Sequence, residues 1–136
     1  MDYECPISQF YTKTLNEISL NYPDSVLKVI AVFPGIPQKA DALTDFKKEY
    51  KVIFHMQGDE KLALTNRFEA KITPEVFLTK RDKFYYQGMI DNAFVKLGEQ
   101  RATVTEKHLI KAISALMDGV AYIPAKTEAV GCVIEK

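Results

Sequence analysis

The sequence has 136 residues, with 18 basic and 18 acidic side chains, two cysteines and 47% hydrophobic residues. This length and composition are typical of one folded domain, residues 1–136, and argue against a disordered chain or a disulfide-rich secreted scaffold. A net charge of zero argues against a nucleic-acid-binding face. No apolar stretch reaches the ~18 residues of a membrane span. The first residues resemble neither a signal peptide nor a transit peptide.

The first third of the chain predicts a helix, a strand and a second helix. Apolar residues recur at spacings of three and four from Ile7 to Tyr22, and Pro6 suits the first helical position. Residues 27–33, LKVIAVF, predict a strand that is buried on both faces. Residues 39–50 predict the second helix.

The middle of the chain predicts shorter elements. Residues 52–56 favour a strand, and Asp59 is placed to cap a short helix after it. Residues 75–79 and 84–87 favour two strands of a hairpin, with residues 81–83 as the turn between them.

The last third combines an irregular stretch, a helix and a tail. Residues 89–102 predict no regular element, whereas residues 103–106, TVTE, have the spacing of a capping box. The helix after it ends at Gly119 and is predicted to face inward through Leu109, Ile110, Ile113, Leu116 and Met117. In the tail, residues 119–136, Val130–Ile134 is strand-like. This order of elements favours an α/β fold with helices on both faces of a sheet.

Cys5 is the strongest candidate for chemistry. It precedes Pro6 at the expected start of the first helix, where unpaired N–H groups and the helix dipole favour an anion such as a thiolate. Asp2 and Glu4 oppose this, because nearby negative charge disfavours the thiolate. The alternative is that Cys5 is only a small apolar residue at a helix start, the commoner role of a lone cysteine.

Thr73-Pro74 and Cys132 are two further candidates. A cis bond before Pro74 would leave the preceding backbone exposed for pairing with an extended peptide, although a trans bond is far more frequent. Cys132 lies in a β-branched segment and is interpreted as a buried tail cysteine, unless the tail folds back near Cys5.

The histidines and one aromatic cluster indicate no further site. His55 and His108 lack metal-ligand spacing to cysteines or acidic residues, so we expect no metal and no cofactor and interpret both as structural or surface residues. Residues 84–86, FYY, are interpreted as hairpin packing rather than a base-stacking platform, because no cluster of Lys or Arg accompanies them.

Taken together, these motifs resemble the thioredoxin-like superfamily, and within it the bacterial redoxin and peroxiredoxin-like branch of thiol–disulfide oxidoreductases. The resemblance extends over nearly the whole chain from Cys5 onward. The matching pieces are the Cys5-Pro6 turn, the strand ending in Val32-Phe33-Pro34, residues 72–78 (ITPEVFL), residues 86–92 (YQGMIDN) and residues 129–134 (AVGCVI).

The resemblance implies a mixed sheet of four or five strands flanked by helices. It places Cys5 at the active-site helix as the residue that attacks a disulfide, with Pro6 tuning the turn. It also implies that Thr73 and Pro74 form a cis-proline loop facing that cysteine, with the Thr73 backbone binding the partner chain.

The sequence departs from the family pattern in three ways. Ser8 stands where the second cysteine of the Cys-x-x-Cys pair belongs, so the resolving thiol must be Cys132, a partner thiol, glutathione or none. Asp2 stands where the peroxiredoxin pattern has a threonine. Only four residues precede Cys5, too few for the strand before the active-site helix. Either residues are missing at the front, or residues 129–134 replace that strand.

Three functions follow from these observations. The leading hypothesis is a thiol–disulfide oxidoreductase-like protein acting through Cys5, with Cys132 as a second thiol; the alternative is a redox-inactive binding or scaffold module of the same fold. A peroxiredoxin-like peroxidase is a weaker hypothesis, because Asp2 stands where that family pattern has a threonine.

The expected partners are protein or small-molecule thiols and disulfides, and a homodimer or strand exchange through the tail is a further expectation. The resemblance implies a bacterial protein, and both extracytoplasmic (periplasmic) and cytoplasmic locations stay open.

Overall fold

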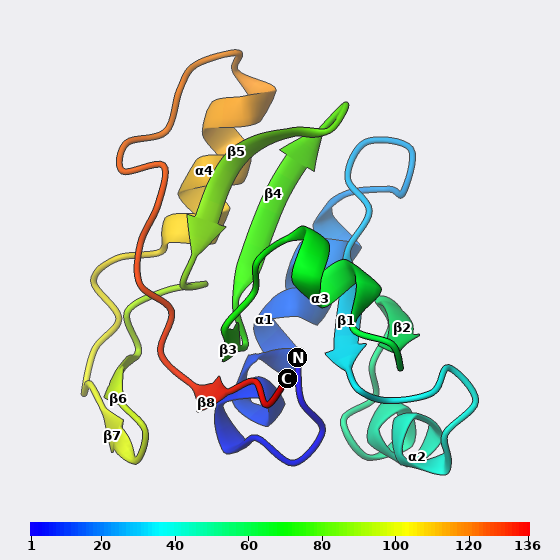
Figure 1. Cartoon of the computed structure of the whole chain (residues 1–136). Helices are drawn as coiled ribbons and strands as arrows, with labels where there is room; N and C mark the ends of the chain where they lie inside the picture. The colour runs from blue at the N-terminus through cyan, green and yellow to red at the C-terminus, as the bar shows by residue number, and fades with distance from the viewer. The chain divides into compact units, whose positions relative to one another are not determined.

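The computed structural model describes residues 1–136 (Figure 1). The chain divides into two compact units: residues 1–71 with 134–136, and residues 72–133. Both contain helices and strands, so the expected α/β class is confirmed. The strands form four two-stranded sheets, β1–β2, β3–β8, β4–β5 and β6–β7. The single-domain organisation stays a prediction.

The first unit begins with α1, Pro6–Asn21, which confirms the helix predicted from the apolar spacing. Proline fits the first turn because its missing N–H is not needed there. The helix buries one apolar stripe, consisting of Ile7, Tyr11, Leu15 and Ile18. The Asn16 side chain ties the C-terminal half of α1 to the loop before β2. Its amide N–H donates to the Lys51 carbonyl (3.1 Å), and its amide oxygen accepts the Ile53 N–H (2.9 Å).

A β-α-β arrangement follows α1. Strand β1 (Ile30–Pro34) and strand β2 (His55–Asp59) are parallel, with Ile30 opposite His55, and α2 (Asp41–Glu49) lies between them in the chain. Two predictions need correction. Strand β2 starts three residues later than expected, because Val52 and Phe54 enter the core before the strand begins. Strand β1 is not buried on both faces: Ala31 and Phe33 are buried and Ile30 is 47% exposed, since a two-stranded sheet leaves one face partly open.

The short helix α3, Ala63–Arg67, is capped from a distance. Its N-cap residue is Leu62, not Asp59. The Asp59 carboxylate nevertheless accepts the N–H groups of Leu64 (3.2 Å) and Thr65 (2.7 Å) and the Thr65 hydroxyl (2.7 Å). Burial alone would raise the pKa of Asp59, but these hydrogen bonds outweigh it and lower the pKa. Asp59 thus satisfies the helix start, although it lies outside the helix.

The second unit is built on a hairpin covered by one helix. Strands β4 (Val76–Lys80) and β5 (Lys83–Gly88) pair antiparallel, which confirms the predicted hairpin, and Arg81 and Asp82 form its turn with positive φ angles. Helix α4, His108–Met117, packs on both strands (Figure 1). Their shared core contains Leu78, Tyr86, Ile90, Ala93, Leu109, Ala112 and Ile113.

The segment before α4 differs from its prediction. Residues 89–102 include a small hairpin, β6 (Phe94–Lys96) with β7 (Glu99–Gln100). The capping box at residues 103–106 does not form, because α4 starts at His108, with Lys107 as its N-cap. The side-chain oxygen of Asn92 instead accepts the N–H groups of Thr105 and Glu106, both at 3.0 Å.

The inward face of α4 is also narrower than predicted. Leu109 and Ile113 are buried, but Ile110 and Met117 are each more than 40% exposed. Helix α4 ends before Gly119, as expected, and Gly119 has the positive φ that allows the chain to turn away.

The tail runs parallel to β5 at Gln87 and then pairs with β3. At Gln87 of β5, the N–H donates to the Ala125 carbonyl and the carbonyl accepts the Thr127 N–H, both at 2.9 Å. Strand β8, Cys132–Val133, then pairs antiparallel with β3, Ile72–Thr73. The predicted replacement of a central strand by residues 129–134 is therefore wrong, because β8 belongs to a separate two-stranded sheet with β3.

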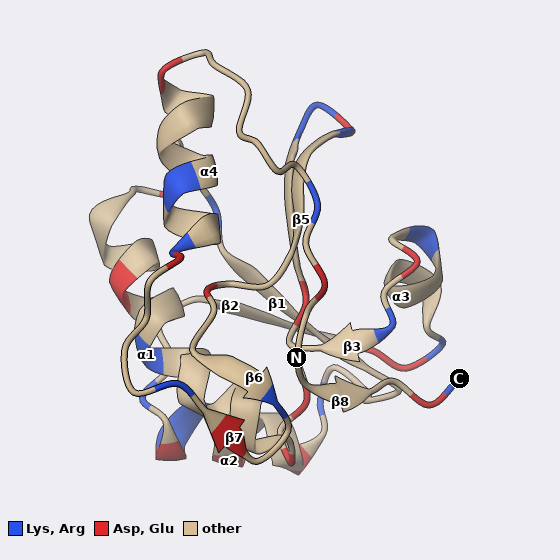
Figure 2. Cartoon of the chain, turned by 90° about the vertical axis from the view of Figure 1, so that its left-hand side faces the viewer, with Lys and Arg blue, Asp and Glu red and all other residues tan.

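Lys and Arg positions and Asp and Glu positions both occur throughout the helices and loops (Figure 2), in keeping with the zero net charge. None of the helices is both long enough and apolar enough to cross a membrane.

Candidate functional site

Cys5 occupies the N-cap of α1. Its backbone is extended (φ −77°, ψ 119°), its carbonyl accepts the Gln9 N–H at 3.0 Å, and no acidic residue lies in the first turn of the helix. The first-turn N–H groups of an α-helix have no partner within the helix and carry the positive end of the dipole. The position therefore favours a negatively charged group. The Cys5 side chain is only 1% exposed.

The loop before α1 is held by one long-range hydrogen bond, from the Met1 amino group to the Val32 carbonyl (2.6 Å), and by several short-range ones. The Asp2 N–H donates to the Ser8 hydroxyl oxygen (3.1 Å), and the Asp2 carboxylate accepts the Glu4 N–H (2.8 Å). The Gln9 amide donates to the Tyr3 carbonyl (2.9 Å). Ser8 is fully buried, whereas Pro6 is exposed. These contacts fix the positions of Asp2 and Tyr3 against the first turns of α1.

Thr73 and Pro74 lie in the second unit, and the peptide bond between them is cis, as the resemblance implied and against the base rate. Both residues are buried. Thr73 is opposite Cys132 in the β3–β8 register, and its hydroxyl donates to the Cys132 carbonyl at 3.4 Å. The structure thus brings together two of the candidate residues, which are 59 positions apart in the sequence.

The six candidate residues divide between the two units. Cys5, Pro6 and Ser8 belong to the first unit, and Thr73, Pro74 and Cys132 belong to the second. Both cysteines are thiols, and Cys132 is more exposed than Cys5. No group of three or more His, Cys, Asp or Glu side chains is arranged to hold a metal ion.

A closed ring of hydrogen bonds around Thr127 was missed by sequence reasoning. The Tyr86 phenol donates its one proton to the Met89 carbonyl (2.6 Å), so the Thr127 hydroxyl must donate in its contact with the Tyr86 oxygen (2.6 Å). The Thr127 oxygen in turn accepts the Met89 N–H (3.0 Å). Burial raises the pKa of Tyr86 to about 12, against the hydrogen bond from Thr127. No sequence signal marks Thr127, because its partners lie about 40 positions away.

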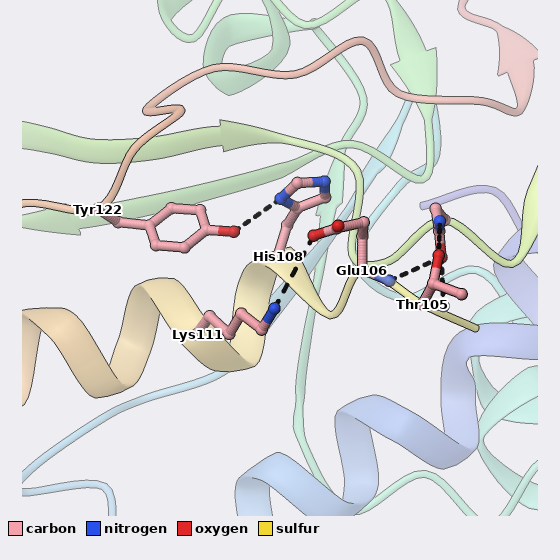
Figure 3. A network of polar contacts seen from close by, with 6 residues as sticks. Thr105, Glu106, His108, Lys111 and Tyr122 are labelled. Atoms are coloured by element: carbon pink, nitrogen blue, oxygen red, sulfur yellow. Dashed lines mark hydrogen bonds and ion pairs between the residues drawn. The ribbon is translucent and has the colours of Figure 1, made fainter.

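The histidine that opens α4 contributes a second contact with the tail. His108 is buried, and its Nδ1 lies 2.7 Å from the Tyr122 hydroxyl (Figure 3). Its ring stacks on Tyr86 with the centroids 6.1 Å apart. Burial, followed by the Glu106 carboxylate, raises the pKa of Tyr122. The interpretation of His108 as a structural residue agrees with these contacts, whereas His55 is exposed and lies 2.7 Å from Asp24.

Comparison with known proteins identifies the fold but no activity. No protein-family model and no curated protein matches the chain. A hypothetical protein from Sinorhizobium meliloti has 23% identity and a TM-score of 0.82, covering 98% of this chain and 75% of that one. An uncharacterized conserved protein from Geobacillus kaustophilus has 20% identity and a TM-score of 0.81, covering 98% and 72%. The chain therefore shares its fold with these two bacterial proteins.

Proposed function

We propose that the chain is a thiol–disulfide oxidoreductase-like protein of thioredoxin-like arrangement, with Cys5 as its nucleophile. The observation that carries this proposal is the position of Cys5 at the N-cap of the 16-residue helix α1, where the helix terminus stabilises a thiolate. The first helical turn itself holds no acidic residue, so the repulsion on a Cys5 thiolate comes from Asp2 and Glu4 in the preceding loop.

The proposed reaction has two exchanges. The Cys5 thiolate attacks one sulfur of a partner disulfide, forming a Cys5–partner disulfide, and the other partner sulfur leaves as a thiolate. A second thiolate then attacks the Cys5 side or the partner side of this mixed disulfide. If Cys132 attacks Cys5, the partner leaves fully reduced, and an external thiol such as glutathione must reduce the resulting Cys5–Cys132 disulfide. If an external thiol attacks, Cys132 is not needed.

A redox-inactive binding module of the same fold is the second candidate. Two observations favour it: the Cys5 side chain is 1% exposed, and the position of the usual second cysteine is held by Ser8, which is fully buried. A protein disulfide reaches a buried thiol only after local opening, and a single thiol cannot resolve its own mixed disulfide.

The two candidates are separated by an insulin-reduction assay with glutathione as electron donor. We expect Cys5→Ser to lower the rate to the uncatalysed background and Ser8→Cys to raise it. The second change places a resolving thiol one helical turn from Cys5, where side chains three positions apart are neighbours. Cys132→Ser is the matched control that reports whether the tail thiol takes part. Equal rates for wild type and Cys5→Ser would exclude the enzymatic function and leave the binding module.

A further inference from the structure

Strand β2 has one edge on β1 and one edge without a strand partner. The ladder with β1 uses the odd-numbered residues of β2. The His55 N–H donates to the carbonyl just before β1 (3.0 Å), and the Asp59 carbonyl accepts the N–H just after β1 (2.9 Å). Because the backbone groups of alternate residues point to opposite edges of a strand, those of Met56 and Gly58 face away from β1. An open edge of this kind is a template for pairing with another chain.

The side chain of Gln38 covers these outward-facing groups. Its amide N–H donates to the Met56 carbonyl (3.3 Å), and its amide oxygen accepts the Gly58 N–H (2.8 Å). The backbone of a residue in a neighbouring parallel strand would make the same two contacts, donating to one carbonyl and accepting the N–H two residues later. The Gln38 carboxamide therefore takes the place of one residue of an additional strand.

Gly58 allows the loop that carries Gln38 to come this close to β2. A Cβ atom built on Gly58 would overlap the Ile36 carbonyl oxygen and lie 2.6 Å from the Gln38 backbone nitrogen. Any other residue at position 58 would therefore push the loop off the edge. Gly35 has a positive φ of 73°, which lets the chain turn directly after β1. The backbone thus holds the glutamine over the edge that its side chain covers.

The edge that Gln38 covers is complementary to itself. Two copies of β2 running antiparallel about Gln57 would place Met56 of each copy opposite Gly58 of the other, because both residues are one position from Gln57. Each such pair would exchange the two N–H···O bonds of an antiparallel ladder, and the two-fold symmetry would repeat the pair. Both hydrogen bonds of Gln38 lie at the protein surface, where water competes for the same groups.

We infer that Gln38 guards the β2 edge against a second copy of this chain, and that two copies pair through β2 when the glutamine leaves the edge. The guard is an autoinhibitory contact, because one side chain saturates the backbone groups that the second copy would use. None of the residues proposed for thiol–disulfide exchange takes part in it.

The test compares the self-association of wild type, Gln38→Ala and Lys39→Ala by sedimentation equilibrium under reducing conditions. Lys39 is the exposed neighbour of Gln38 and serves as the matched control. We expect Gln38→Ala to associate about tenfold more tightly than wild type or better, because alanine leaves the Met56 carbonyl and the Gly58 N–H open. Lys39→Ala should match wild type. Equal association of all three proteins, or an equal rise in both variants, would overturn the inference.

Two further measurements locate the contact on β2. Adding Met56→Pro to Gln38→Ala removes an N–H that points away from β1 and that only the second copy would use, so the double variant should return to wild-type association. Persistent tight association would contradict the inference. In Gln38→Ala itself, hydrogen-exchange protection of the Gly58 amide should rise with protein concentration. A protein that associates while this protection stays constant would pair elsewhere, which would also contradict the inference.

Discussion

The first turn of α1 and the tail between Gly119 and Val133 are stabilised over very different distances along the chain. Around Cys5, the side-chain hydrogen bonds of the loop join residues two to six positions apart. Around Thr127, they join residues 38 and 41 positions apart, and the Thr73–Cys132 contact spans 59.

This difference in sequence distance affects how much stability each region loses when one of its residues is substituted. A local contact can re-form whenever the helix re-forms, because its partners remain neighbours in the unfolded chain. A long-range contact loses its partner altogether when the tail detaches. Substitutions in the tail should therefore cost more stability than substitutions of similar chemistry at the start of α1.

Thr127→Val is expected to have the largest effect. Valine has nearly the same shape but removes the hydroxyl, leaving the Met89 N–H and the Tyr86 oxygen without the Thr127 partner in a partly buried site. The expected loss is about 2–3 kcal/mol of unfolding free energy, measured by urea denaturation. Thr127→Ser keeps the hydroxyl and serves as the control. A loss below about 0.5 kcal/mol for the valine variant would show that the ring does not stabilise the tail.

Raising the pH above 10 should weaken the same ring of hydrogen bonds, with a smaller loss of unfolding free energy than Thr127→Val. The folded-state pKa of Tyr86 is raised from 10.0 to about 12, so its stabilising contribution is complete below pH 10 and is lost as the pH rises from 10 to 12. At pH 11, wild type should have lost roughly 1 kcal/mol more stability than Tyr86→Phe, relative to pH 9. Parallel pH curves for the two proteins would contradict the raised pKa.

Ser8→Ala is expected to have the smallest effect. It removes one hydrogen-bond acceptor of the Asp2 N–H at the start of α1, which should lower the unfolding free energy by about 0.5–1 kcal/mol. Ser19→Ala, farther along the same helix, is the control for the change in helix propensity. A larger loss for Ser8→Ala than for Thr127→Val would reverse the comparison between the two regions.

Elements with a strong local signal were predictable. Helix α1 follows its apolar spacing and Pro6, and the β4–β5 hairpin follows its turn residues, so both match their predictions closely. The capping box at residues 103–106 was wrong because Asn92, a residue from an earlier loop, takes the N–H groups that a capping side chain would have satisfied. The start of β2 was wrong because burial of Val52 and Phe54 in the core outweighed their strand propensity.

In the candidate site, too, features set by nearby residues were predictable and features set by distant residues were not. Cys5 could be placed at a helix N-cap from Cys5-Pro6 and the apolar stripe alone, because capping depends on residues within one turn. The role of Thr127 could not be found, since a threonine in a tail has no distinguishing local pattern. Its importance arises only from β5 passing beside it.

The sequence by itself determined the α/β class, the helix that begins after Cys5 and the absence of a second cysteine at position 8. These depend on composition and on interactions within a few residues. Only the tertiary structure decided that Cys132 lies opposite Thr73, that Gly131 leaves room for the Thr73 carbonyl and that Thr127 closes a ring with Tyr86 and Met89. Such pairings depend on which distant segments the folded backbone brings within hydrogen-bond range, and no local pattern records that choice.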